Sequence, residues 1–331
     1  MSISKFPDLE RLTAGLTTVF YGEEGTQGNV TILNRQPNIY ESTFPSEIVT
    51  CCLADDRKLR LFCKYGLKQF DSNYDHRGNV FYEAKVYRDV LQPLQTSAPF
   101  FYGVYEDTNS DVTWLIVEYL ENGVHLSKMG GNSDSMISAA RWIGQFHAAN
   151  EVRLLRIPMP FLIKYDAEYY IRWARRANLL VSHLPTRFLW LSSLCEGFVR
   201  LLPRFLTAPQ TIIHGEYYPH NIICQNGDIR PVDWQSTAIA VGEIDLAALT
   251  EGWPKEIAKD CELQYRRLRW PEGKPDIFEQ SLDVARLYMT LRWLGELGNR
   301  PIDSIVTNGF LKWLEKLHCS AFTLGERLGL V

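Results

Sequence analysis

The sequence lacks several features that would assign it directly to a class of protein. Its 7 cysteines are odd in number and form no CxxC pair, so we expect neither a disulfide framework nor a cysteine-based zinc site. No run of about 18 apolar residues and no apolar signal core are present, so we expect no membrane span or membrane partner. We therefore expect a cytoplasmic protein with reduced core thiols.

Charge of a single sign is also missing. The net charge is −4 over 331 residues, and acidic and basic residues are mixed along the chain. Nucleic-acid binders usually carry a basic face, so no nucleic-acid partner is expected. With 46% hydrophobic and 22% charged residues the composition is that of a globular protein. At roughly 100–200 residues per domain, the length favours two domains.

The N-terminal half is predicted to be rich in β-strands after a short polar stretch. Strand-like runs occupy 30–33, 47–53, 59–65 and 114–120, and turn signals stand at 35–38, 43–46, 55–58 and 121–123. From Ser135 onward the chain is predicted to be mostly helical, over 135–150, 166–180, 188–206 and several segments after 245. This pattern predicts an α+β protein with two lobes, 1–120 and 121–331, and ligands commonly bind between domains.

One predicted helix, from about Val80 to Leu94, carries a charged residue on its apolar face. Its apolar residues recur at helical spacing, and Glu83 falls on the same stripe because it precedes Tyr87 by four and Leu94 by eleven residues. A carboxylate that faces a protein core needs a partner. The sequence therefore predicts that Glu83 has a partner in the core.

The segment 211–234 reads TIIHGEYYPHNIICQNGDIRPVDW and contains the candidate chemical residues. Asn226-Gly227 between apolar runs predicts a β-hairpin. With these two residues as the turn, the numbers of paired residues sum to 453, so Asn221 pairs with Val232 and Asp233 lies one step beyond. Opposite side chains there are roughly 5 Å apart. That spacing suits Mg²⁺ with phosphate oxygens and water.

Each residue of this segment also has a plainer interpretation when taken alone. An Asn or Asp beside a turn is commonly a turn residue or a helix cap. We interpret His214 as a structural residue that holds the loop. Tyr217, Tyr218 and His220 are interpreted as packing or solvent-facing side chains. Only the joint pattern favours a metal–phosphate site.

The joint pattern resembles a known family. HGExxxxN followed by VDW is similar to the catalytic and metal-binding loops of the aminoglycoside phosphotransferase and choline kinase group, relatives of the protein kinases, and GEIDLAAL is similar to that group's G-x-x-x-D-L-A segment. The resemblance is strong over 211–249 and fainter elsewhere. It implies a bilobal protein-kinase-like fold, with a small nucleotide-binding lobe and a larger lobe for catalysis and acceptor binding.

The resemblance implies roles for residues in both lobes. Glu216 would orient or deprotonate the acceptor hydroxyl, Asn221 and Asp233 would bind Mg²⁺, and Asp245 would hold the catalytic loop. The remaining implied residues belong to the ATP site. They are Lys64, for the α- and β-phosphates, its partner Glu83, and the hinge Glu118-Tyr119-Leu120, whose backbone groups at Glu118 and Leu120 would bind the adenine edge. Lys58 and Lys68 are weaker competitors for the role of Lys64.

The sequence departs from the family pattern in two places. Glu216 stands where the family usually has Asp, which keeps the carboxylate but adds a methylene, so its oxygens reach about 1.5 Å further. No GxGxxG or Walker A motif is present, so the phosphate loop would be the turn from Glu41 to Ser46, with hydroxyls from Ser42, Thr43 and Ser46.

The implied activity is transfer of the ATP γ-phosphoryl group to a hydroxyl of a small molecule such as a sugar, amino alcohol or natural product. The alternative is a pseudokinase that binds nucleotide without transfer. A protein kinase is disfavoured because HRD, DFG and APE segments are absent. Aromatic and acidic residues of the helical half are either acceptor contacts or core packing; they include Tyr165, Asp166, Tyr169, Tyr170, Trp173, Glu251, Trp253, Trp270 and Tyr288.

Overall fold

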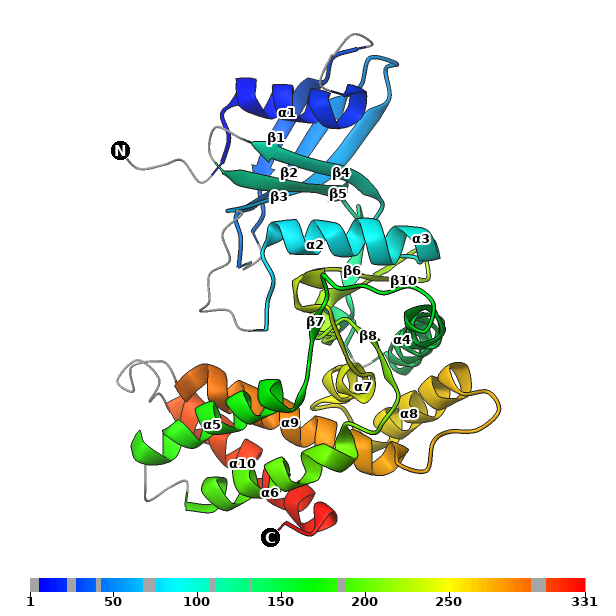
Figure 1. Cartoon of the computed structure of the whole chain (residues 1–331). Helices are drawn as coiled ribbons and strands as arrows, with labels where there is room; N and C mark the ends of the chain where they lie inside the picture. Colours follow the sequence, from blue (N-terminus) through cyan, green and yellow to red (C-terminus); the bar gives the residue numbers. More distant parts are fainter. Residues whose placement is uncertain are drawn as a thin grey trace. The chain divides into compact units, whose positions relative to one another are not determined.

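The structure is a computed structural model that describes residues 6–22, 28–39, 43–67, 76–107, 111–130, 132–183, 189–298 and 308–330 (Figure 1). Contacts along the chain divide it into two compact units. The first comprises Met1–Gly131 and Pro219–Thr237, and the second comprises Asn132–Tyr218 and Ala238–Val331. The boundary after residue 120 that the sequence suggests stays a prediction.

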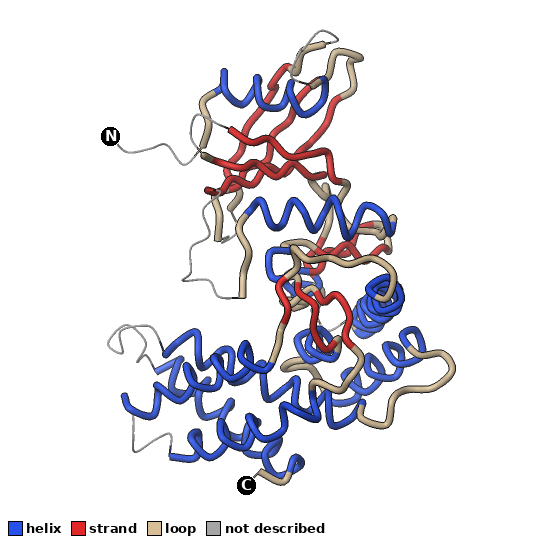
Figure 2. Tube along the Cα trace, in the orientation of Figure 1, coloured by secondary structure: helices blue, strands red, loops and turns tan. Residues whose placement is uncertain are grey.

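The first unit contains a five-stranded antiparallel sheet, seen in red in Figure 2. Its strands, in the order β1-β2-β3-β5-β4, are β1 (Thr31–Pro37), β2 (Ser46–Cys52), β3 (Lys58–Leu67), β5 (Val112–Glu118) and β4 (Phe101–Asp107). Side chains alternate between the two faces of a strand. On β3, Cys63 and Tyr65 belong to the apolar core under the N-terminal helix, which leaves Lys64 for the opposite face.

The N-terminal helix α1 (Leu9–Tyr21) lies before the strands, where the sequence predicted a short polar stretch and no helix. The Asp8 carboxylate accepts a hydrogen bond from the Arg11 amide, which caps the helix, and Leu12 and Leu16 are buried four residues apart. Three threonines in the segment 13–18 lower its helix propensity and hide this pattern. Packing of the apolar stripe on the sheet overrides that weak preference.

Two strand boundaries also differ from the prediction. The turn expected at 35–38 is wrong for Arg35, Gln36 and Pro37, because β1 continues through them and pairs Arg35 with Val49 and Pro37 with Glu47. The Arg35 guanidinium donates to both carboxylate oxygens of Glu47, at 2.9 and 2.7 Å, which holds this edge strand in register. The strand predicted over 114–120 runs instead from Val112 to Glu118.

The helix predicted from Val80 to Leu94 is present, with a widened turn in its second half. It consists of α2 (Val80–Val86), a π-helical turn over Tyr87–Leu91, and α3 (Gln92–Leu94). Pro93 explains the widening, because its ring would clash with the carbonyl of residue 89 in a regular α-helix. The Gln92 amide donates instead to Tyr87, five residues earlier.

The predicted hairpin is confirmed in its register. Strands β9 (Ile222–Gln225) and β10 (Asp228–Pro231) pair as expected, and the Val232 amide donates to the Asn221 carbonyl at 2.9 Å. The strand β6 (Val124–His125) adds to the other edge of β9. Asn226 and Gly227 have φ values of 53° and 89°, the left-handed conformations of a type I′ turn.

This turn gives a stability prediction. Replacing Gly227 with alanine adds a Cβ that meets no neighbouring atom but forces an unfavourable positive φ. We expect a loss of about 1 kcal/mol in the free energy of unfolding, measured by urea denaturation. The control is Asn226→Gly, which keeps a residue suited to positive φ and is expected to change stability less. A Gly227→Ala protein as stable as the wild type would contradict the turn assignment.

The second unit is mainly helical, which agrees with the predicted class. Its helices are α4 (Ser133–Leu154), α5 (Ala167–His183), α6 (Leu189–Phe205), α7 (Glu243–Thr250), α8 (Lys255–Arg269), α9 (Phe278–Gly298) and α10 (Asn308–Leu328). A small sheet has the order β7 (Ile163–Lys164), β11 (Ala238–Val241) and β8 (Gln210–Ile213). Within the described residues, no helix is both long and apolar enough to cross a membrane.

Candidate active site

Three charged side chains of the first unit meet at one point. The Lys64 ammonium lies 2.8 Å from Glu83 Oε2 and 2.6 Å from Asp233 Oδ1. The side chains of Lys64 and Glu83 are 4% and 3% exposed, whereas that of Asp233 is 32% exposed. Glu83 thus has a partner, as the helical stripe predicts, and this partner is the Lys64 that the family resemblance implies. A second carboxylate, Asp233, contacts Lys64 from 169 positions away.

The backbone around Asp233 aims its carboxylate. Asp233 adopts left-handed φ and ψ values of 66° and 63°, a conformation that is uncommon for residues other than glycine. The next amide, that of Trp234, donates to Glu83 Oε1 at 3.1 Å. Glu83 thus contacts Lys64 with one carboxylate oxygen and the Trp234 amide with the other. It fixes Lys64 and the backbone after Asp233 relative to α2.

The electrostatics of this cluster favour a bound cation. Burial alone would lower the pKa of Lys64, but the carboxylates of Asp233 and Glu83 raise it well above its usual value, so the ammonium stays protonated. Burial raises the pKa of Glu83, and Lys64 opposes this shift. The cluster holds two carboxyl groups for one ammonium. Asp233, the more exposed of the two acids, is the one that can share its oxygens with a ligand.

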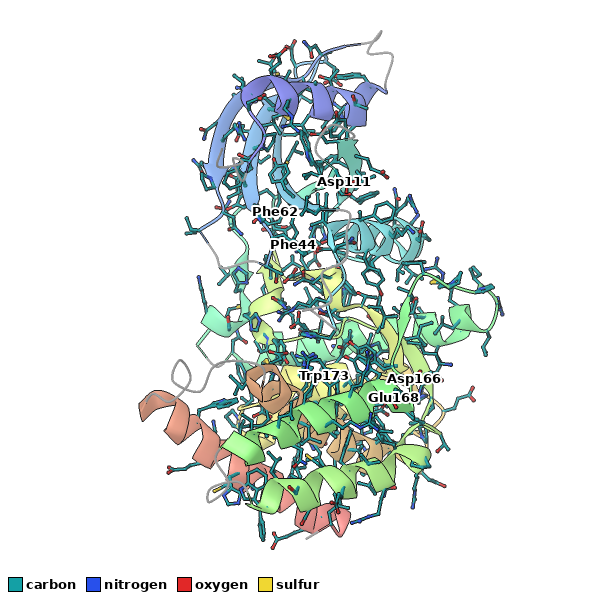
Figure 3. The ribbon with its side chains drawn as sticks, turned by 60° about the vertical axis from the view of Figure 1, so that its left-hand side comes forward. Phe44, Phe62, Asp111, Asp166, Glu168 and Trp173 are labelled. Atoms are coloured by element: carbon teal, nitrogen blue, oxygen red, sulfur yellow. The ribbon has the colours of Figure 1, made fainter. Side chains whose placement is uncertain are left out.

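The cluster lies in a cavity of about 810 Å³ in the first unit, within the size range of small-molecule sites. Six of the seven residues predicted for the site line this cavity, namely Lys64, Glu83, Glu118, Leu120, Asn221 and Asp233. Apolar side chains that include Ile48, Phe62, Val117 and Ile223 form other walls. The Lys64 ammonium also lies 5.9 Å from the ring centre of Phe44, a residue labelled in Figure 3.

The predicted hinge residues differ in what they offer a ligand. The Glu118 carboxylate accepts from the Phe100 amide and from Arg230, so this side chain is tied to protein groups. Its own amide donates to the Phe100 carbonyl at 2.8 Å. Leu120 accepts from Gly123, and no hydrogen-bond acceptor for the Leu120 amide is found among the described residues. Leu120 therefore keeps a backbone donor for a ligand.

The cavity is also lined by polar residues that sequence reasoning missed, His125, Ser127 and Lys128, and by His220, which it left as packing or solvent-facing. His125 Nδ1 lies 2.6 Å from the His220 carbonyl, to which it can only donate. Burial lowers the pKa of His125, so its ring is neutral with the proton on Nδ1. The run Val124–Lys128 directly follows the strand break at Gly123, and that proximity to the hinge was the signal available in the sequence.

In the second unit, Asp245 holds the backbone of the HGE loop, as the sequence predicted. Its carboxylate accepts from the amides of His214 and Gly215, at 2.7 and 2.9 Å. His214 Nδ1 lies 3.3 Å from the Glu216 amide, so the loop is held from within as well. Glu216, the predicted catalytic carboxylate, is almost fully buried in this unit.

A directed chain of buried hydrogen bonds supports Asp245. His147 Nε2 lies 3.1 Å from Asp245 Oδ2, and its Nδ1 lies 2.9 Å from the Tyr265 hydroxyl, which accepts from Arg269 at 2.6 Å. Every contact is satisfied when neutral His147 donates to Asp245 and accepts from Tyr265. A Cβ at Gly242 would lie 2.5 Å from Arg269 Nη1 and 2.7 Å from His147 Nδ1, so this position excludes any larger residue.

The buried position of His147 predicts a measurable titration. Burial lowers its pKa from 6.5 to about 4, against the opposing effect of Asp245. Between these values the unfolded chain binds a proton that the folded chain does not, so stability falls as the pH falls through that window. Histidine ring resonances followed by NMR should show His147 neutral at pH 5.5. Titration of this ring near pH 6.5 would contradict the assignment.

Other predicted positions have mixed outcomes. Glu41 and Ser42 of the suggested phosphate loop, and the competitor Lys68, lie outside the described residues. Thr43 Oγ1 accepts from Gln235 at 3.3 Å, and Ser46 Oγ accepts from Asn38 at 3.1 Å, so both hydroxyls contact protein groups. Lys58, the other competitor, is exposed at the far end of β3.

The aromatic residues considered for the acceptor are mostly core residues. Tyr165, Tyr169, Tyr170, Trp173 and Tyr288 are at most 3% exposed, and the rings of Tyr165 and Tyr169 stack 3.7 Å apart. Figure 3 labels Trp173 beside Asp166 and Glu168 on and before α5. The packing interpretation therefore holds for these five residues, and they leave the acceptor unassigned.

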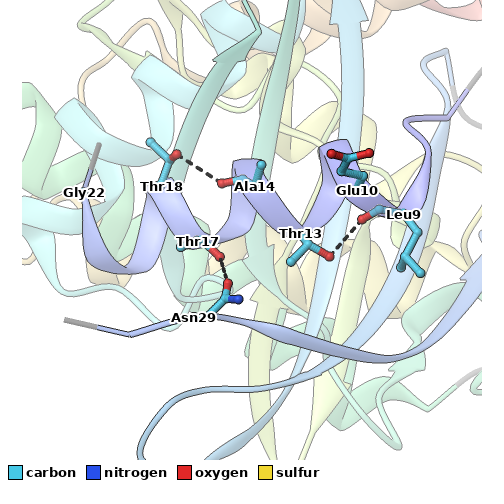
Figure 4. A pocket seen from close by; sticks show the side chains of 8 residues that line it. All are labelled: Leu9, Glu10, Thr13, Ala14, Thr17, Thr18, Gly22 and Asn29. Carbon is cyan, nitrogen blue, oxygen red and sulfur yellow. Dashed lines mark hydrogen bonds between the residues drawn. The ribbon is translucent and has the colours of Figure 1, made fainter. Parts of the chain in front are cut away.

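A second hollow, of about 660 Å³, follows the outer side of α1 (Figure 4). Its polar side chains are occupied locally, since Thr13 and Thr18 donate to the carbonyls of Leu9 and Ala14 and Thr17 donates to Asn29. Among the described residues that line it, Glu10 is the only charged one, and they include no group suited to catalysis.

The chain matches no protein-family model and no curated protein sequence. Its structure is similar to solved kinases. The choline kinase LicA from Streptococcus pneumoniae superposes with a TM-score of 0.61 at 12% identity, over 95% of this chain and 99% of that chain. Amicoumacin kinase, in complex with AMP-PNP, Ca²⁺ and Ami, gives 0.64 at 10% identity over 96% and 94%. The GDP complex of aminoglycoside 2′-phosphotransferase-IIIa gives 0.55 at 13% identity over 88% and 94%.

At identities this low, the structural similarity shows the fold alone. The activity has to be argued from the residues. The similarity extends over nearly the whole length of each of these two solved chains. The resemblance over 211–249 thus extends, at the level of structure, to most of the chain. The chain has the bilobal protein-kinase-like fold of choline kinase and the aminoglycoside phosphotransferases.

Proposed function

We propose that the protein is an ATP-dependent kinase that transfers the γ-phosphoryl group to a hydroxyl of a small molecule. The observation that carries this proposal is the cluster of Lys64, Glu83 and Asp233 in a cavity that Asn221 and Leu120 also line. A protonated lysine that contacts two carboxylates, beside the side-chain amide oxygen of Asn221, suits a nucleoside triphosphate bound with a metal ion. In this proposal Lys64 contacts the α- and β-phosphates and Leu120 donates its amide to the base.

The donor set fits Mg²⁺. Asp233 and Asn221 offer one carboxylate and one amide oxygen, and Mg²⁺ commonly binds through one or two carboxylates together with substrate phosphates. No group of three or more His, Cys, Asp or Glu side chains that could hold a metal alone is found in the described residues. A metal bound here would offset phosphate charge, and it would depend on the nucleotide to complete its ligands.

We assign the chemical step to the HGE loop of the second unit. Phosphoryl transfer depends mainly on positioning and charge stabilisation. Glu216 is proposed to orient the acceptor hydroxyl and to accept its proton as the oxygen–phosphorus bond forms and the bond to the ADP oxygen breaks. Asp245 keeps the loop in place through the two amides that precede Glu216.

The test is a screen of hydroxyl compounds with Mg-ATP that follows ADP release. The structurally similar proteins are described as kinases of choline, amicoumacin and aminoglycosides, so amino alcohols, sugars and natural products form the first panel. We expect ADP release that needs Mg²⁺, that is slow with water, that rises with one class of acceptor, and that is lost in Glu216→Ala. Tight ATP binding without transfer across the panel would instead support the pseudokinase, the alternative suggested by Glu216 in place of Asp.

A further inference from the structure

A buried arginine on α9 contacts the HGE loop from within the second unit. Arg292 has a side chain that is 1% exposed. Its Nη1 donates to the Gly215 carbonyl at 3.0 Å, and its Nη2 donates to the Tyr218 hydroxyl. The same Nη2 lies 3.8 Å from Glu216 Oε1. One guanidinium therefore contacts the residue before Glu216, the residue two positions after it, and its carboxylate.

A buried charge in this position needs an explanation. Removing a guanidinium from water costs several kcal/mol unless nearby charges and hydrogen bonds compensate. Burial alone would lower the pKa of Arg292, but Tyr218, Tyr288, Glu216 and Glu296 raise it well above its usual value, so the group stays charged. Glu296, one turn later on α9, lies 3.6 Å from Arg292 Nε. Two acids thus balance the cation, and one of them is the proposed base.

The partner on the loop is itself fixed. The Tyr218 hydroxyl accepts a second hydrogen bond from Trp293 Nε1 at 2.9 Å, so two neighbouring residues of α9 hold one tyrosine. The Tyr218 amide also donates to the Glu216 carbonyl at 2.7 Å. The loop is therefore held by its amides on one side, through Asp245, and by a carbonyl and a side chain on the other, through Arg292.

We propose that Arg292 is a positioning residue that aims the Glu216 carboxylate at the acceptor hydroxyl, an inference that rests on the proposed kinase function. A glutamate has one more rotatable bond than the aspartate usual at this position, so its carboxylate samples more orientations. A fixed cation near Oε1 selects among them and favours the ionised form. Arg292 thereby compensates for the longer side chain of Glu216.

The test follows ADP release from Mg-ATP with water as the acceptor, in the full chain. Arg292→Lys keeps the charge and removes the fork that reaches Gly215 and Tyr218 together. We expect the maximal rate to fall about 10- to 100-fold, because small misplacements of reacting groups have effects of that size. The KM for ATP should stay within about twofold of the wild-type value, since Arg292 is not among the residues that line the nucleotide cavity.

A double-mutant cycle separates this role from simple structural support. If Arg292 acts through Glu216, the double variant Glu216→Gln/Arg292→Lys should be no slower than Glu216→Gln alone. A further 10-fold loss in the double variant would overturn the proposal. The matched control is Arg286→Lys on the same helix, where Arg286 pairs with Glu262 and Asp283. This substitution is expected to leave the rate unchanged.

The remaining outcomes are also decisive. A wild-type chain that releases no ADP with water or with any compound of the hydroxyl panel overturns the kinase function and this inference with it, whereas an active wild type unaffected by Arg292→Lys overturns the inference alone. Should Arg292→Lys fail to fold, Glu216→Asp provides the test, because it withdraws the carboxylate from Arg292 without removing the buried cation. We expect at least a 10-fold loss of maximal rate in Glu216→Asp. An unchanged rate in that variant would overturn the proposal.

Discussion

Replacing Asp233 with asparagine is expected to reduce Mg²⁺-dependent ADP release about 100-fold or more. The substitution removes the exposed carboxylate of the cluster, which is the charge proposed to bind the metal ion, and groups that stabilise developing charge are typically worth this much. Asparagine tolerates the left-handed backbone that Asp233 adopts, so the chain path should be kept. Lys64 keeps its buried partner Glu83. The measurement is the rate of ADP release across a Mg²⁺ titration.

The control for this prediction lies on the same hairpin. Asp228 is exposed beside the Asn226-Gly227 turn, and Asp228→Asn removes the same charge without touching the cluster. Its rate and Mg²⁺ dependence should match those of the wild type. If Asp233→Asn retained the wild-type rate at the wild-type Mg²⁺ concentration, the carboxylate would have no role in binding the metal, and the site assignment would have to be abandoned.

Local sequence patterns predicted the parts of the site whose geometry is set over short distances. The register that places Asn221 opposite Val232 follows from one two-residue turn, because pairing in a hairpin is fixed by its loop. The burial of Glu83 follows from helical periodicity within a single element. These features depend on a few neighbouring residues, which is why they were readable without a structure.

The parts that escaped prediction depend on contacts between distant segments. Arg292 is one arginine on an amphipathic helix, and nothing in its neighbours shows that it reaches Gly215, 77 residues away. His147 lies within the helix predicted over 135–150, and nothing in that pattern shows that its ring joins Asp245 to Tyr265, 118 residues away. Helix α1 was missed because its threonines weaken a pattern that only tertiary packing completes. The fold class and the role of Asp245 were readable, whereas the distant residues that support Asp245 and contact the loop, His147 and Arg292, were not.

Tyr265→Phe is expected to lower the free energy of unfolding of the second unit by about 2 kcal/mol, although it deletes a single oxygen. That hydroxyl accepts from Arg269 and donates to His147, both buried. Its loss leaves a nitrogen of the His147 ring without a partner in a dry environment, and an unsatisfied buried polar group typically costs about 1–3 kcal/mol. Urea unfolding followed by circular dichroism measures the change. The effect should extend to activity, because His147 supports the carboxylate of Asp245 that holds the HGE loop.

Tyr169→Phe is the matched control for this last prediction, because Tyr169 is an equally buried tyrosine of the same unit. Its hydroxyl lies 3.0 Å from the hydroxyl of Tyr288, a neutral partner. A hydroxyl that loses a neutral partner can rotate to adapt, whereas the His147 ring is held on its other side by Asp245. We therefore expect Tyr169→Phe to lower the free energy of unfolding less than Tyr265→Phe does. Equal losses in both variants would mean that the Arg269–Tyr265–His147–Asp245 chain contributes nothing beyond an ordinary buried hydrogen bond, and its proposed support of the catalytic loop would fail.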